Sequence, residues 1–329
     1  MKIALPARLR TCVSVLGLTA LSLAVLPLSL HAQAAGKNNP ASKVYFADVS
    51  GEAQIDTGTV VQDLAKRSVY NAQGTVIETK KAEKEEDKAK IYSTMVYSNG
   101  TGAYFDQDTR VEVKRFVQEP FTPNRADMDV EPSISQTQAF VSRGAVGLCT
   151  SKLVAGSSMN YATAQGSINI RGRKVVIEAN DNETKISMLE GESTVRGGEA
   201  DLGGHTLEAG FQAIIRRGAA GQPNVVRVQR IPPNEVTQLD DKVAQACMAK
   251  KTVYFEVKEH EVGSGGPGGN EIAGDVAGDT PVTAFDQPAE NANKNGSSGI
   301  VREIVPVQVV PAYVPVQTAE SPSTLPIKT

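Results

Sequence analysis

Side chains that could perform catalysis or bind a metal are scarce in this sequence. His205 lies in "DLGGHTLEAG", within the strand-rich part of the chain, and His260 lies beyond that part. A Ser-His-Asp or Cys-His arrangement would have to use His205, but no G-x-S-x-G sequence accompanies it. No group of Cys and His has the spacing of a metal site. We therefore predict that the protein is not an enzyme and has no cofactor or bound metal, with a hydrolase that uses His205 as an alternative.

Two other patterns have only a weak similarity to ligand sites. The "SGGPGG" stretch lacks the Lys-Ser/Thr ending of a phosphate loop and does not lead into a helix. The acids of "NDNE", residues 180–183, fall in an expected hairpin turn, which is weak support for a Ca²⁺ site. The chain has no Trp and is 5% aromatic, so a large stacking platform for sugars or bases is not expected.

The first 34 residues have the organisation of an export signal. Lys2, Arg8 and Arg10 precede an apolar run over residues 12–30, and Ala-Gln-Ala ends at residue 34 as a small-x-small cleavage pattern. An uncleaved membrane anchor is the alternative, because the run is near the length that spans a bilayer. After cleavage, no other segment is apolar enough to span a membrane, so we predict an exported protein.

The charge of the mature chain bears on its partners. Cleavage takes 3 of the 34 basic residues and no acid, which leaves 31 basic against 37 acidic residues and a formal charge of −6. A mildly acidic surface does not indicate nucleic acid or anionic lipid as a partner. Two cysteines remain, Cys149 and Cys247. In an oxidising compartment they either form a disulfide or remain two separate buried thiols, and the sequence leaves both alternatives open.

Residues 41–231 read as a series of short strands separated by Gly, Asn and Asp. The clearest alternation covers residues 206–216, where Leu207, Phe211 and Ile215 share one face. One dry face and one wet face are typical of an antiparallel sandwich or jelly roll, and no βαβ alternation is present. Residues 80–90 are a mixed-charge run expected to form a hairpin extension or short surface helix, and residues 119–132 are expected to form a long loop.

One helix is predicted over about residues 233–250, where Pro232 and Pro233 end the preceding strand. Asn234 is expected to cap its start. An apolar stripe at helical spacing predicts that the helix lies against the sheet with Cys247 on the buried side. This stripe consists of Val236, Leu239, Val243, Ala246 and Cys247. A final strand over residues 252–257 would complete a β domain that spans residues 41–258, with its core at residues 44–216.

Beyond Lys258 the composition becomes rich in Gly and Pro, and we predict a disordered tail over residues 259–329. Prolines at 306, 311 and 315 forbid a helix and favour an extended chain. The segment from Val305 to Val316 could alternatively dock on another protein's sheet edge or groove. Its contacts would come from Val305, Val307, Val309 and Val310.

The segment "INIRGRKVVIE", residues 168–178, changes its strand phase in the middle. Ile168 and Ile170 share one face, but the apolar residues after Gly172 have the opposite parity. A glycine at a phase change is typical of a β-bulge or a corner in a twisted sheet. Arg171 would then either lay its guanidinium across neighbouring carbonyls or pair with an acid such as Glu190. A functional alternative is that Arg171 and Arg173 contact an anionic ligand or a partner.

The order of these signals resembles the FecR-like domain family over about residues 44–216. The family's "l..G.v" and "iRGT" signatures would correspond to residues 141–146 and to Ile170-Arg171-Gly172, and its later glycines to Gly191 and Gly210. The resemblance implies a periplasmic β domain of a Gram-negative-type bacterium without catalytic residues. Family members relay the state of a siderophore receptor to a sigma factor. Arg173 stands where the family has Thr, and residues 1–10 are too few for the family's sigma-binding region.

These observations together predict a mainly β, sandwich-like or jelly-roll-like FecR-type domain that is free-standing and exported to the periplasm or the cell surface. Its predicted function is to bind an envelope protein or a surface polymer, with a role in signalling as one form of that function. Arg171, Gly172, Arg173, Gly191 and Gly210 are its candidate structural or contact residues. The alternative is a periplasmic carrier of lipid or lipopolysaccharide, with an apolar groove between its sheets.

Overall fold

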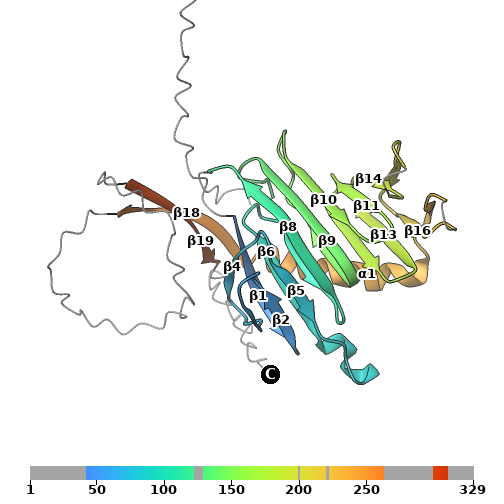
Figure 1. The fold of residues 1–329 in the computed structure, drawn as a ribbon, viewed down its shortest axis with the longest axis horizontal. Coiled ribbons are helices and arrows are strands. Elements are labelled where there is room, and N and C mark those ends of the chain that lie inside the picture. The colour runs from blue at the N-terminus through green and yellow to red at the C-terminus, as the bar shows by residue number, and fades with distance from the viewer. Residues whose placement is uncertain (1–41, 122–128, 199–200, 220–221, 263–298, 310–329) are drawn as a thin grey trace, which may run out of the picture. The chain divides into compact units, whose positions relative to one another are not determined.

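Two β-sheets lie face to face in the computed structural model, which describes residues 42–121, 129–198, 201–219, 222–262 and 299–309 (Figure 1). The predicted signal peptide, residues 1–34, lies outside the described residues. The predicted fold class, mainly β with one packed helix, is confirmed. All strand pairs of the two sheets are antiparallel except β9 with β10.

We call the two layers sheet A and sheet B. In spatial order, sheet A consists of β4 (Val69–Asn71), β1 (Lys43–Ser50), β6 (Tyr92–Tyr97), β7 (Gly102–Phe105), β9 (Ser135–Cys149), β12 (Lys174–Ala179), β13 (Glu183–Glu190), β16 (Phe211–Arg216) and β17 (Val225–Arg230). Sheet B consists, in the same sense, of β3 (Val61–Asp63), β2 (Ala53–Asp56), β5 (Val76–Thr79), β8 (Arg110–Gln118), β9, β10 (Ser158–Ala162), β11 (Ser167–Ile170), β14 (Glu192–Arg196) and β15 (His205–Glu208).

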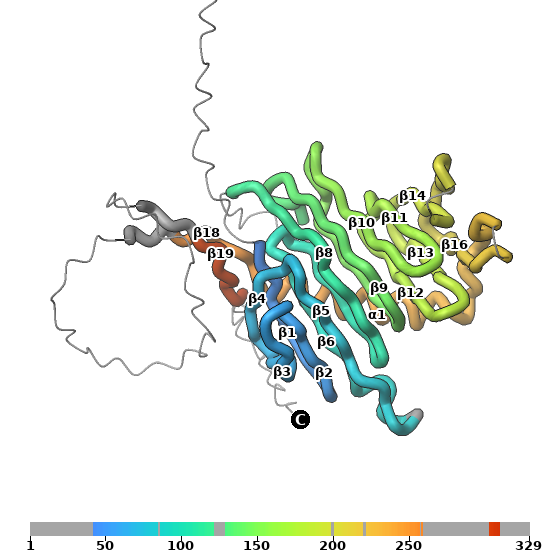
Figure 2. Tube along the Cα trace, in the orientation of Figure 1, coloured from blue at the N-terminus to red at the C-terminus, as the bar shows by residue number. Residues whose placement is uncertain are grey.

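Strand β9 belongs to both sheets. Its residues 135–143 pair with β8 and β10 in sheet B, and residues 144–149 pair with β7 and β12 in sheet A. The strand changes layer at Gly144, which has a φ of 88°. A Cβ at this position would lie 2.3 Å from Thr109 Oγ1, so the crossing requires glycine. Figure 2 shows the long path of β9 between its neighbours.

The predicted strand over residues 206–216 is two strands. β15 lies in sheet B and β16 in sheet A, with Gly210 between them at a φ of 84°. The apolar alternation continues across the break because Leu207 and Ile215 face the same core from opposite layers. Ala209 has the same parity as Leu207 and Phe211, but it is exposed in the turn.

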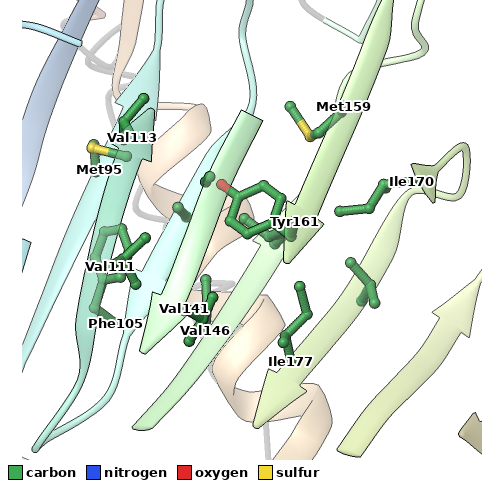
Figure 3. Close-up of a cluster of buried hydrophobic side chains, with 14 of the residues drawn as sticks. Met95, Phe105, Val111, Val113, Val141, Val146, Met159, Tyr161, Ile170 and Ile177 are labelled. Atoms are coloured by element: carbon green, nitrogen blue, oxygen red, sulfur yellow. The ribbon is translucent and has the colours of Figure 1, made fainter. Parts of the chain in front are cut away.

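The core lies between the inner faces of the two sheets. Figure 3 shows side chains such as Phe105, Tyr161 and Ile177 converging there from strands of both layers. The hydroxyl groups of Tyr97 and Tyr161 are 3.0 Å apart and hydrogen bond to each other, which satisfies two polar groups in an apolar interior. Burial raises the pKa of Tyr97 to about 12, so both phenols stay neutral.

Helix α1 (Pro233–Lys250) covers the outer face of sheet A, as the sequence predicts. The helix contacts β7, β9 and β12, and it passes closely over Gly102 of β7 and Gly147 of β9. A Cβ on Gly102 would lie 2.1 Å from the Ala246 carbonyl oxygen. The glycines therefore let the helix backbone lie almost against the strands.

The start of α1 differs from the prediction. The helix begins at Pro233, with Pro232 at the N-cap position and no side-chain cap, so Asn234 does not cap it. Proline at the first helical position needs no cap partner because it lacks an N–H. Val236, predicted in the buried stripe, is 42% exposed, whereas Leu239, Val243 and Ala246 of that stripe are buried.

The predicted boundary at Lys258 and part of the predicted disordered tail are wrong. β18 (Val253–Val262) continues past Lys258 and pairs in an antiparallel ribbon with β19 (Gly299–Gln308). Pro306 lies opposite Phe255 in this ribbon. A two-stranded ribbon tolerates proline because each strand has a free edge where no N–H is needed.

The β18–β19 ribbon extends the cover of sheet A. Phe255 and Ile304 pack with Tyr45 and Val96 on the outer face of β1 and β6. Gln308 Nε2 donates a hydrogen bond to the Tyr45 hydroxyl at 3.2 Å. Residues 305–308 of the predicted docking segment therefore pair within this chain, and residues 310–316 lie outside the described residues.

The two predicted insertions have local structure. Residues 85–90 form the 3₁₀ helix η1 (Glu85–Lys90), which agrees with the expected short surface helix. The loop over residues 119–132 is described only at its ends, and its C-terminal end contacts both the core and α1. Among the described residues, no helix combines the length and apolar character that a membrane span requires.

Candidate functional site

The predicted corner at Arg171–Arg173 is the link between the two sheets. β11 pairs with β10 and β14 in sheet B, whereas β12 pairs with β9 and β13 in sheet A. The phase change in the sequence therefore marks a change of layer, since the inner face lies on opposite sides of the two strands. A register shift between Lys174 and Val175 places a β-irregularity directly after the corner.

Gly172 is needed for its lack of a side chain rather than for its backbone angles. A Cβ there would lie 2.7 Å from Met188 Sδ and 2.8 Å from the Glu190 carbonyl oxygen. A positive φ, which glycine tolerates best, is found instead at Gly191, at 90°. A Cβ on Gly191 would lie 2.6 Å from the Gly172 Cα, so the two glycines pack directly on each other.

Hydrogen bonds hold the corner from both sheets. The Thr150 hydroxyl donates to the Gly172 carbonyl at 2.7 Å, and the Arg173 N–H donates to the Glu190 carbonyl at 2.8 Å. On the sheet B side, the Arg171 N–H donates to Ser193 Oγ at 3.2 Å. The corner is thus a rigid junction that fixes where its two arginines point.

The two arginines have different surroundings. Arg173 lies 3.3 Å from Asp129 and 3.9 Å from Glu190, and Lys174 lies 3.1 Å from the same Glu190. Of the two alternatives for Arg171, the pair with Glu190 is wrong, since Arg173 and Lys174 are the cations beside that carboxylate. Both arginines are exposed, and Arg171 directly follows Ile170, the last residue of β11 in sheet B.

A disulfide joins Cys149 of β9 to Cys247 of α1, with the two Cα atoms 5.1 Å apart. Of the two alternatives that the sequence left open, the structure has the bridge. It closes a loop of 98 residues between sheet A and its helix. The stabilisation expected from such a loop is about 4–5 kcal/mol in the chain-entropy account.

Ion pairs reinforce the attachment of α1. The Lys242 ammonium, on a side chain that is 9% exposed, lies 2.8 Å from Asp106 and 3.4 Å from Glu178. Lys250 lies 3.1 Å from Asp129, the residue that also contacts Arg173. The side chain of Lys250 packs over Gly102, which has no Cβ to obstruct it. The same face of α1 therefore carries both the disulfide and these buried ammonium groups.

A buried carboxyl that sequence reasoning missed lies at the end of the 119–132 loop. Glu131 is 2% exposed and accepts hydrogen bonds from Asn99 Nδ2 at 3.3 Å, from the Val154 N–H at 3.2 Å and from the Ser135 hydroxyl. Burial raises the pKa of the Glu131 carboxyl, and these hydrogen bonds oppose that rise. The only sequence signal was an acid between a valine and a proline in a loop.

We define the open face as the outward side chains of β9, β10, β11 and β14 in sheet B. Strand register places Gln138, Asn160, Asn169 and Thr194 side by side in one row across these strands. Asn169 Nδ2 donates a hydrogen bond to Asn160 Oδ1 at 2.7 Å, which orients two amides of the row. Within the part of the chain that the structure describes, no helix or strand packs over this row.

His205 lies at the start of β15 with about half of its side chain exposed. Its Nε2 is 3.3 Å from Asp201 Oδ2. The Asp201 carboxylate accepts backbone hydrogen bonds from Gly197 and Gly204, which lower its pKa. The Asp201 carboxylate thus links the backbone at Gly197 and at Gly204 with the His205 side chain. In "NDNE", Asn180 Oδ1 accepts the N–H groups of Asn182 and Glu183, as expected for a turn.

The fold and surfaces define a two-layer β-sandwich with one outer face covered by a disulfide-linked helix. No model of a known protein family matches the sequence. No curated protein matches it either.

Two solved structures have partial similarity to this chain, and both are described as a "putative anti-sigma factor" from Parabacteroides distasonis. The first has a TM-score of 0.34 at 14% identity and covers 49% of this chain and 62% of its own. The second has a TM-score of 0.30 at 14% identity and covers 42% of this chain and 55% of its own. The chain thus spans less than two thirds of either structure.

Proposed function

We propose that this protein is a non-enzymatic, exported FecR-like module that binds another component of the cell envelope through the open face of sheet B. The observation that carries the proposal is the difference between the two outer faces. The outer face of sheet A is occupied by α1 and the β18–β19 ribbon. The open face presents the polar row of Gln138, Asn160, Asn169 and Thr194.

The chemistry of the open face suits a polar partner. Amide and hydroxyl groups donate and accept hydrogen bonds without carrying charge. Arg171 continues the outward side of β11 beyond Asn169 and adds a cation at the edge of the row. A protein or a surface polymer with many hydrogen-bonding groups is therefore the proposed partner, and a signalling role would follow from a protein partner.

The interior supports a surface function over a lipid carrier. Large side chains from both layers are fully buried between the sheets, where a carrier would keep an acyl-chain groove. Tyr97, Tyr161, Phe46 and Phe105 are the largest of these side chains. Native mass spectrometry of the purified protein provides the check, since a co-purifying lipid would favour the carrier.

A pull-down from native cell envelope tests the proposal. The bait is the mature chain, with Asn169→Arg as the open-face variant and Asn182→Arg, in the exposed turn between β12 and β13, as the matched control. We expect Asn169→Arg to lose the captured partner and Asn182→Arg to keep it. Equal capture by both variants would contradict binding through the open face. Analysis of the captured material for protein and for carbohydrate identifies the partner's class.

A further inference from the structure

A second surface, the free edge of β17, lies at the end of sheet A. We infer that this edge binds an extended, acidic segment of another polypeptide, which adds to sheet A as a further strand. The inference shares with the proposed function only the premise that the protein binds a partner, because it uses a different sheet and a different chemistry.

Along one side of β17, no strand of the described residues pairs with the backbone N–H and C=O groups. β17 is six residues long and pairs in unbroken register with β16 along its other side. Val225 and Val228 are 62% and 40% exposed. The other terminal strands of the two sheets are shorter, with three residues in β3, three in β4 and four in β15. β17 is therefore the longest terminal strand on which another strand can form.

The hydrogen bonds identify which residues of β17 face outward. The Ile231 N–H donates to the Gly210 carbonyl at 2.9 Å, which continues the register of β16 and β17. In an antiparallel pair, alternate residues direct their N–H and C=O to the partner strand. Val225, Arg227 and Gln229 have the parity of Ile231 and bond to β16. Val226, Val228 and Arg230 thus present their backbone groups to the free edge.

The charge around this edge selects the partner. Residues 216–230 contain four arginines and no acid, in a chain with a formal charge of −3. Arg216 pairs with Glu183 at 2.9 Å, and Arg230 lies over the Phe211 ring. Arg227 is exposed on the outer side, opposite Ile214. An acidic strand would meet these cations favourably.

The same arginines argue against a second copy of this chain as the added strand. Two copies of β17 that paired antiparallel through the free edge at Val226 and Val228 would place Arg227 of one strand opposite or diagonal to Arg227 of the other. Like charges on adjacent strands are destabilising. Arginine on this edge strand therefore disfavours pairing with a second copy and favours an acidic strand.

The test uses fluorescent peptides and polarisation measurements. The probe is a seven-residue peptide of alternating Val and Glu, and the comparison peptide has Lys in place of Glu. We expect the full chain to bind the Val/Glu peptide and not the Val/Lys peptide. The Arg227→Glu variant should weaken binding of the Val/Glu peptide about tenfold, as expected for loss of a charge contact.

A second pair of measurements tests strand addition itself. Val228→Pro removes an outward N–H without changing the bonds to β16, and Val228→Ala is the matched control. We expect the proline variant to bind the Val/Glu peptide about tenfold more weakly than the alanine variant. Since the proline variant could fail to fold, a Val/Glu peptide methylated at alternate backbone nitrogens provides an independent measurement, and it should also lose binding to the unmodified protein.

Two results would overturn the inference. One is equal binding of the methylated and unmethylated peptides, which would show attraction to an anion without strand pairing. The other is the absence of Val/Glu binding by the folded chain. Asn169→Arg distinguishes the two proposals, because it should abolish envelope capture and leave peptide binding unchanged. If the unmodified chain captured its envelope partner but did not bind the Val/Glu peptide, the result would contradict only the role of β17.

Discussion

The outer faces of sheets A and B differ in what their strands present. Sheet A has Gly102 and Gly147 beneath α1, with a disulfide beside them. Sheet B has Asn160 and Asn169 at its centre, joined by a hydrogen bond between their side chains. Small residues allow close packing of another element, whereas amides retain hydrogen-bonding groups at the surface. The outer face of sheet A thus packs against other elements of this chain, and the polar row on sheet B is the surface that we propose contacts a partner.

The largest effect on stability should come from removing the disulfide that joins α1 to sheet A. Replacing both Cys149 and Cys247 by Ser should lower the free energy of unfolding by about 3–5 kcal/mol, because the unfolded chain regains the freedom of the closed loop. Urea unfolding of the oxidised protein and the double variant measures this. A loss below about 1 kcal/mol would mean that the disulfide contributes little to the attachment of α1.

The next largest effect on stability should come from the close packing of α1 over Gly102. Gly102→Ala should destabilise the protein by about 1–3 kcal/mol, since the new methyl would meet the Ala246 carbonyl and displace the helix. Thermal and urea unfolding measure the change. Gly203→Ala is the matched control, because a Cβ there has nothing within 4 Å. If the two variants were equally stable, the helix would not depend on the glycine.

A methyl group added at the corner between the sheets should cost less stability than one added at Gly102. We expect Gly172→Ala to lower the free energy of unfolding by about 1–2 kcal/mol, since a flexible methionine provides one of the two close contacts. Unfolding in urea measures the change, and a second variant with Met188→Ala tests the cause. The double variant should lose less than the sum of the two single losses. Additive losses would place the strain at the Glu190 backbone instead.

Glu131 should give the protein a specific pH dependence. Its pKa is raised in the folded state, so the folded protein keeps this proton at pH values where the unfolded chain has lost it. The contribution is therefore complete below the ordinary glutamate pKa and is lost as pH rises through the folded value. Glu131→Gln should remove this decline in the free energy of unfolding with rising pH. Urea unfolding between about pH 4 and pH 7 measures it.

A matched control is available for this experiment. Glu119→Gln changes an exposed acid in the same loop and should leave the decline in place. An unchanged pH profile for Glu131→Gln would show that the buried carboxyl is not its source.

The smallest effect on stability should come from the open face. Asn169→Ala should change the free energy of unfolding by no more than about 0.5 kcal/mol, because its side chain bonds only at the surface of the sheet. Its effect on envelope capture should be larger than that on stability. Unfolding and the pull-down, done on one preparation, measure both. A large loss of stability would place Asn169 among the structural residues and weaken the contrast between the two faces.

The local patterns in the sequence predicted individual elements well. Pro232, Pro233 and the 3.6-residue stripe predicted α1, since a helix start and an amphipathic face are both local features. Alternation at residues 206–216 predicted which residues face the core, but it could not show that Gly210 separates two layers. A side chain that points to the core has the same parity whether its strand lies in sheet A or sheet B.

Features that depend on distant contacts could not be predicted. The cysteines are 98 residues apart, and nothing near either one indicates its partner. β19 contains Val305, Pro306 and Val307 in succession, a pattern equally typical of an extended tail, and only its pairing with β18 makes it a strand. Glu131 lies among partners from distant parts of the chain, since Asn99 and Val154 both donate hydrogen bonds to its carboxylate.

The shared strand β9 has a consequence for how the domain unfolds. Because β9 hydrogen bonds to β8 and β10 through one half and to β7 and β12 through the other, neither sheet can open at its centre without disrupting this strand. The two layers should therefore form a single cooperative unit. Amide hydrogens on either side of Gly144 should then exchange with solvent only through global unfolding, and at a common free energy.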